Sequence, residues 1–122
     1  QKTAYEIRNC DWSSDVCSSD LEYTEYALAV DEIAERIRAI GARAPGSYTE
    51  FTELASVKED CGAPVAMEMI RNLVADQETT VASARKIVEV AEAAGDQATA
   101  DLGVRRIEIH EKNAWMLRSH LE

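Results

Sequence analysis

The sequence predicts an all-α protein with three long helices and one short cross-helix. Apolar residues recur at steps of three and four in each long segment, which is typical of amphipathic helices. Leu, Ile, Val and Ala dominate the apolar residues, and glycines and prolines interrupt the long stretches of good helix formers. Helices joined in this order are typical of a helix bundle in a single domain.

The first 21 residues differ in character from the rest of the chain. Residues 11–21 can be back-translated into DNA that resembles the constant end of a short-read sequencing adapter, and residues 1–6 into another constant block of the same oligonucleotide. We therefore interpret residues 1–21 as an adapter-like artefact with no native fold, and residues 22–122 as the C-terminal part of a longer domain. The alternative is that this segment is genuine and that Cys10 and Cys17 form a redox pair, although no neighbouring group is evident that would activate a thiol.

The first long helix is predicted over Tyr23–Ile40, with Gly41 as its natural stop. A short helix is predicted over Tyr48–Leu54, where Ser47 and Glu50 have the spacing of a capping box. The apolar stripe of the first helix, which we expect to face the core, consists of Tyr23, Tyr26, Val30, Ile33, Ile37 and Ile40.

Two further long helices are predicted over Val65–Ala94 and Gln97–Leu121, separated by Gly95 and with Asp96 as the cap of the second. In the helix over Val65–Ala94, the residues expected to form the buried seam are Ile70, Val74, Gln77, Val81, Ala84, Val88 and Ala91. In the helix over Gln97–Leu121, the apolar residues expected to pack in the core are Leu102, Val104, Ile107, Ile109, Trp115, Met116, Leu117 and Leu121.

Charge and cysteine content restrict the classes of function. The formal net charge is −10, which disfavours direct contact with nucleic acid and favours cations or basic partners. Outside the adapter-like segment Cys61 has no second cysteine to pair with, so we expect a reducing, cytoplasmic setting. No apolar run approaches the roughly 20 residues that span a bilayer, so no membrane association is expected.

Asp31 and Glu35 are the strongest candidate site residues. They lie four residues apart and project from one side of the first helix, beside Leu28. Carboxylates on helices that face other helices are how bundle proteins hold iron or manganese. From spacing alone, a solvated pair near Arg36 and Arg38 is the favoured interpretation, because Asp and Glu four residues apart are common on helices.

Other polar residues give weaker signals. Asp96 and Asp101 fall in the first turns of the last helix, where capping and the helix dipole are a sufficient explanation. His110 and Glu111 do not begin a zinc-protease motif, because Ala114 stands where its second histidine would be. We expect His110 and His120 to be exposed or interfacial polar residues.

Three segments carry a resemblance to a known family. Residues 29–41 resemble the second bundle helix of the Dps-type ferritins, the DNA-protection and iron-storage proteins of bacteria. Residues 95–101 resemble the turn into the last helix, and residues 110–122 resemble that helix, with Lys112 and Trp115 at the family spacing. The resemblance extends over residues 22–122 and implies a ferritin-like four-helix bundle that lacks its first helix.

The resemblance also implies a function. Members oxidise ferrous iron between two-fold related subunits of a hollow oligomer, a dodecamer, store the ferric product, and in some cases protect DNA at the nucleoid. Asp31 and Glu35 match the family's carboxylate ligands, and no catalytic residues separate from the metal ligands are expected. Asp96 and Asp101 match acidic positions that would draw cations towards a pore.

The other half of the metal site is missing from the matching positions. The family's second-helix histidine would fall at position 16, which is Val16, and its acidic partner at Asp20, inside the adapter-like segment. Two carboxylates without imidazole partners do not make the intact site, so we expect this chain to be inactive as a ferroxidase. The alternative function is a non-catalytic helical assembly or adaptor module, in which Asp31 and Glu35 pair with arginines across an interface.

Overall fold

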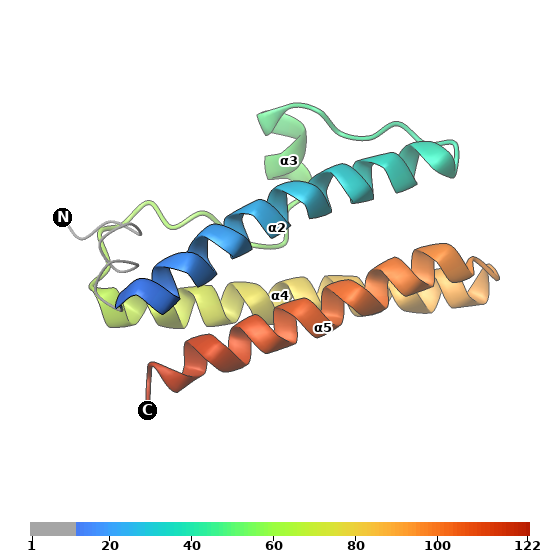
Figure 1. Ribbon diagram of the computed structural model, residues 1–122. Coiled ribbons are helices and arrows are strands. Elements are labelled where there is room, and N and C mark those ends of the chain that lie inside the picture. The colour runs from blue at the N-terminus through green and yellow to red at the C-terminus, as the bar shows by residue number, and fades with distance from the viewer. Residues whose placement is uncertain (1–11) are drawn as a thin grey trace. The chain divides into compact units, whose positions relative to one another are not determined.

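The computed structural model describes residues 12–122, with side chains from residue 23 onward (Figure 1). Its helices are α2 (Trp12–Ala39), α3 (Tyr48–Leu54), α4 (Ala66–Ala93) and α5 (Gln97–Ser119). Every regular element in this described range is helical, which confirms the predicted all-α class. The chain divides into two units, one that ends at Glu50 and one over Phe51–Glu122, and each is described by itself.

Helix α2 is longer than predicted. It starts at Trp12, so part of the adapter-like segment has a helical backbone, whereas Cys10 lies outside the described residues. The interpretation of residues 1–21 as an artefact stays a prediction, because a helical backbone can form on a foreign sequence. The C-terminal end of α2 agrees with the predicted stop at Gly41. This residue has a φ of 91°, a conformation that glycine adopts without strain.

The expected core stripe of α2 is mostly exposed. Tyr23 is 81% exposed, Val30 60%, Ile33 38% and Ile40 56%, whereas Ala29 is the buried residue among the described side chains of this helix at 7%. The prediction that the stripe faces the core is therefore wrong for these four positions. Periodicity determines which residues share one side of a helix, but it does not supply the surface that covers them.

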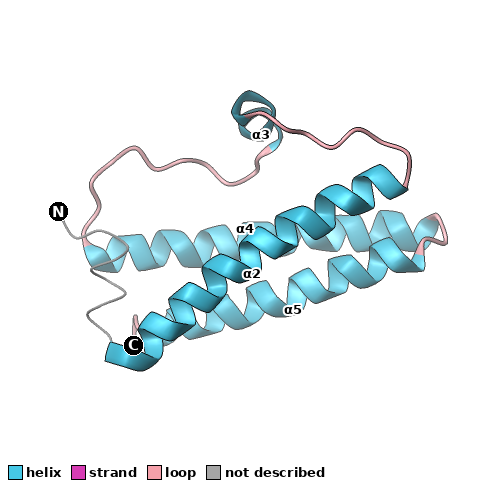
Figure 2. Cartoon of the chain, turned by 45° about the horizontal axis from the view of Figure 1, so that its top comes forward, coloured by secondary structure: helices cyan, strands magenta, loops and turns pink. Residues whose placement is uncertain are grey.

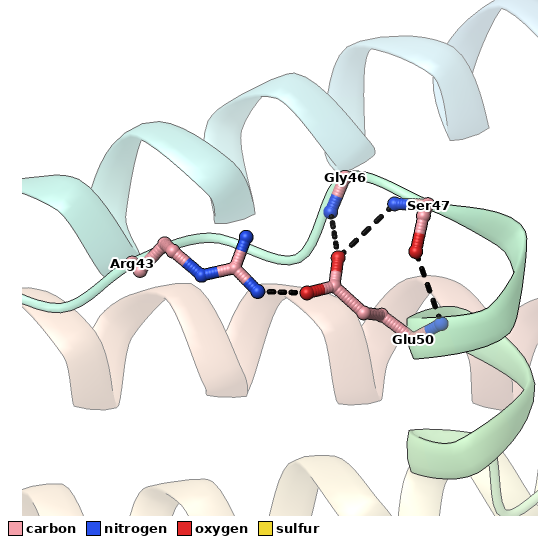
Figure 3. Close-up of polar contacts among 4 residues, drawn as sticks. All are labelled: Arg43, Gly46, Ser47 and Glu50. Atoms are coloured by element: carbon pink, nitrogen blue, oxygen red, sulfur yellow. Dashed lines mark hydrogen bonds and ion pairs between the residues drawn. The ribbon is translucent and has the colours of Figure 1, made fainter.

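Polar contacts stabilise the N-terminus of the short helix α3 (Figure 3). The Glu50 carboxylate accepts hydrogen bonds from the backbone N–H groups of Gly46, at 2.8 Å, and Ser47, at 3.2 Å. In return the Ser47 hydroxyl accepts one from the backbone N–H of Glu50, at 3.3 Å, which confirms the predicted capping box. Arg43 pairs with the second oxygen of Glu50 and ties the preceding loop to the helix.

Helices α4 and α5 form an antiparallel hairpin and lie side by side (Figures 1 and 2). The turn between them uses Gly95, which has a φ of 70°, and the backbone N–H of Asp96 donates to the carbonyl of Ala91 at 2.8 Å. The Asp96 carboxylate accepts from the backbone N–H of Thr99 at 3.1 Å, as expected for an N-cap. The predicted stop and start signals are therefore both confirmed.

The seam of the hairpin consists largely of small residues. The predicted α4 seam is confirmed, since none of its residues is exposed and Val74, Val81, Ala84 and Ala91 are buried. Opposite them, α5 buries Ala100, Leu102, Gly103 and Ala114. The prediction for α5 is wrong at Val104, which is 42% exposed, and at Trp115, which is 64% exposed. Both residues project from the side of α5 that α4 does not cover.

Gly103 lies at a close approach of the two helices. A Cβ atom at this position would lie 2.7 Å from Cγ2 of Val88 and 3.4 Å from the carbonyl oxygen of Ala84. Real Cβ atoms do not come within 2.7 Å of another carbon, so only glycine fits without movement of a neighbour.

Ion pairs join the exposed edges of the hairpin. Arg85 of α4 contacts Glu111 of α5 at 2.5 Å, and Glu78 of α4 contacts Arg118 of α5 at 2.7 Å. All four side chains are largely exposed, so each pair contributes at most about 1 kcal/mol. Among the described helices, none combines the length and the apolar character needed to cross a membrane.

Candidate metal centre

Asp31 and Glu35 lie on one side of α2, as the sequence predicts. Four residues along a helix rotate by about 40° beyond a full turn, so the two carboxylates are neighbours one turn apart. Both are exposed, and so are Thr24 and Leu28 on the same side, with Leu28 65% exposed. This side of α2 is open to a ligand or to a second chain.

Two carboxylates alone do not make a complete metal site. Their oxygens are hard ligands that suit iron and manganese, and bundle proteins combine them with further carboxylates and with histidines. Within residues 23–122, where side chains are described, no group of three or more His, Cys, Asp or Glu residues is placed to hold a metal ion. The pair is therefore half of a site at most in this part of a single chain.

Both histidines of the chain belong to the unit that follows Glu50, whereas Asp31 and Glu35 belong to the unit that ends there. His110 belongs to the unit that follows Glu50, is only 9% exposed, and lies with Nδ1 2.6 Å from Oε1 of Gln77. His120 is the exposed C-cap residue of α5. The expectation of an exposed or interfacial polar residue agrees with His120 but is wrong for His110, which is buried within the hairpin and contacts Gln77 of α4.

Asp96 and Asp101 have different surroundings. Asp96 is half-buried, and its carboxylate accepts hydrogen bonds from both the backbone N–H and the hydroxyl of Thr99. Asp101 is exposed, five residues further along α5 and about 140° around its axis. Asp96 is thus engaged in capping, and the fold does not bring the two carboxylates to the same side of the helix.

A row of buried polar residues on α5 was not predicted from the sequence. Arg106 is 7% exposed and Asn113 is 8% exposed, and with Gly103 and His110 they recur at steps of three and four. The same spacing that identifies apolar seams could have identified this row. It was not recognised because charged and amide side chains are seldom buried.

Comparison with known proteins identifies the family. A family model described as a ferritin-like domain matches residues 19–122. The chain belongs to the ferritin-like family. This match extends over most of the described residues, and it includes α3, α4, α5 and the greater part of α2.

The relatives of this ferritin-like chain include DNA protection during starvation proteins. It is 37% identical over 99 residues to DNA protection during starvation protein 2 of Bacillus anthracis, with 81% of this chain and 68% of the relative covered. It is 40% identical over 102 residues to an uncharacterized low temperature-induced protein of Nostoc sp., with 82% of this chain and 57% of the relative covered. The chain thus spans roughly three fifths to two thirds of the length of these relatives.

Solved structures of Dps proteins share the fold. Dps from Staphylococcus aureus superimposes with a TM-score of 0.84 at 29% identity, covering 99% of this chain and 77% of that one. Dps from Vibrio cholerae, described as a member of a broad superfamily of ferritin-like diiron-carboxylate proteins, gives a TM-score of 0.82 at 26% identity. It covers 99% of this chain and 72% of that one. The ferritin-like fold predicted from the resemblance is therefore confirmed.

Proposed function

We propose that this ferritin-like chain belongs to an iron-oxidising and iron-storing assembly, in which Asp31 and Glu35 are ligands of the substrate iron. Ferrous ions would bind at a site shared between chains, lose an electron each to dioxygen or hydrogen peroxide, and be stored as ferric product inside a hollow homo-oligomer. Such an activity would make the complete assembly an oxidoreductase.

One observation carries this proposal: two neighbouring, exposed carboxylates occupy one side of a helix in a chain of the ferritin-like family. The description of the similar Vibrio cholerae protein as a diiron-carboxylate superfamily member supports iron as the ion. The carboxylates would bind Fe²⁺ by replacing its water ligands, and their negative charge would stabilise the ferric state after oxidation.

The incomplete ligand set supports a site shared between chains. The described side chains supply no third ligand beside Asp31 and Glu35, so the remaining ligands would come from a second chain. The histidine that the family resemblance calls for at position 16 is Val16 in this sequence. We therefore expect this chain by itself to bind iron weakly and to oxidise it slowly or not at all.

Exposed apolar surface supports assembly with further copies. The large exposed side chains include Tyr23 and Leu28 on α2, Ile87 and Val90 on α4, and Trp115 on α5. Exposed large apolar side chains are typical of surfaces that become buried on association. We infer a homo-oligomer, and a dodecamer is the form that the family resemblance implies.

Protection of DNA is a further role that the names of the relatives suggest. The net charge of −10 repels phosphate, so such protection would act through removal of iron and its oxidants rather than through direct contact by this part of the protein. A cytoplasmic protein, associated with the nucleoid only if another segment binds DNA, is the corresponding proposal for location.

The test is to map Fe²⁺ on the isotopically labelled chain without oxygen. Paramagnetic Fe²⁺ should broaden the amide signals around Asp31 and Glu35 selectively. The double variant Asp31→Asn/Glu35→Gln, which preserves side-chain shape and removes two charges, should lose this broadening.

A charge-matched control separates ligation from general attraction. Glu32→Gln/Glu89→Gln also removes two charges from exposed helical positions and should leave the broadening unchanged. Equal broadening in the unaltered chain and in Asp31→Asn/Glu35→Gln would overturn the iron site. It would favour the non-catalytic assembly or adaptor function instead.

A further inference from the structure

We draw no further inference here: the strongest candidate, the exposed apolar row of Leu73, Ile87 and Val90 along α4, carries none, because nothing in the described part of the structure shows what covers it.

Discussion

Nδ1 of the buried His110 lies 2.6 Å from the side-chain oxygen of Gln77, so a polar contact joins α5 to α4 within the buried seam of the hairpin. The amide oxygen of glutamine can only accept a hydrogen bond, which assigns the proton to Nδ1. A buried polar group that loses its partner keeps the full cost of its desolvation. The contact therefore makes the pairing of the two helices specific at this level of the hairpin.

Replacing Gln77 by leucine tests this contact. Gln77→Leu should lower the free energy of unfolding by about 1–3 kcal/mol, because the imidazole of His110 then remains buried without this acceptor. The double variant Gln77→Leu/His110→Leu should lose less than the sum of the two single changes. Urea unfolding followed by circular dichroism measures both quantities, and strictly additive losses would show that the two side chains are not coupled.

Gly103 should not tolerate even alanine. Alanine is the better helix former by about 1 kcal/mol, but its Cβ would collide with Val88, and overpacking of this kind costs about 1–3 kcal/mol. Because Val88 is β-branched and stiff, we expect Gly103→Ala to lower the free energy of unfolding.

The collision at Gly103 predicts a specific rescue. Val88→Ala removes the colliding methyl group, so adding it to Gly103→Ala should restore part of the lost stability. Gly46→Ala is the matched control, since a Cβ at Gly46 meets nothing within 4 Å. A Gly103→Ala chain as stable as the unaltered one in urea unfolding would contradict the close approach.

Substitutions of Asp96 and of Asp101 should have different effects on the free energy of unfolding. Asp96→Ala removes the N-cap of α5 and should cost about 0.5–2 kcal/mol, whereas Asp96→Asn should retain most of the capping. Asp101→Ala, at an exposed position, should change the free energy of unfolding by less than about 0.5 kcal/mol.

A charge-neutralising change at Asp101 tests the uptake of cations. If these carboxylates draw iron towards a pore of the proposed assembly, Asp101→Asn in the complete, iron-oxidising assembly should slow mineralisation of added Fe²⁺ while its stability stays the same. Unchanged mineralisation would leave Asp96 as a cap and Asp101 as a solvated residue. Asp96→Asn is not a clean test of cation uptake, because the carboxylate of Asp96 already accepts a hydrogen bond from Thr99.

Introducing a histidine at position 16 should improve the proposed site. Residue 16 belongs to α2, and the family resemblance places an imidazole ligand there. One added ligand should strengthen Fe²⁺ binding by roughly 10-fold or more, by analogy with the losses seen when metal-site residues are removed. Val16→His should therefore raise the rate of iron oxidation, measured by the absorbance of the ferric product under air.

The gain expected from Val16→His depends on the carboxylates of Asp31 and Glu35. Val16→His combined with Asp31→Asn/Glu35→Gln should lose the gain, since the imidazole would then have no carboxylate pair to complete. Val16→Leu is the control for a change of size without a ligand. A gain that persists after removal of the carboxylates would place the iron elsewhere on the chain.

The sequence by itself determined the helices and most of their ends, although it did not predict the start of α2 at Trp12. The bounds of α3, the capping box of Ser47 and Glu50, and the N-cap at Asp96 follow from contacts between residues a few positions apart. The hairpin seam of α4 was equally predictable, because helical periodicity defines one side and α5 follows at once in the chain. The shared side of Asp31 and Glu35 on α2 follows from the same geometry.

Tertiary structure alone decided which of these sides is covered. The stripe that includes Tyr23 and Val30 has the spacing of a core but is mostly exposed, while Arg106 and Asn113, which are polar, are buried. The local sequence pattern determines only which residues share one side of a helix, whereas burial requires a second surface that packs against that side. The glycine requirement at position 103 has the same origin, since it depends on the side chain of Val88 in another helix.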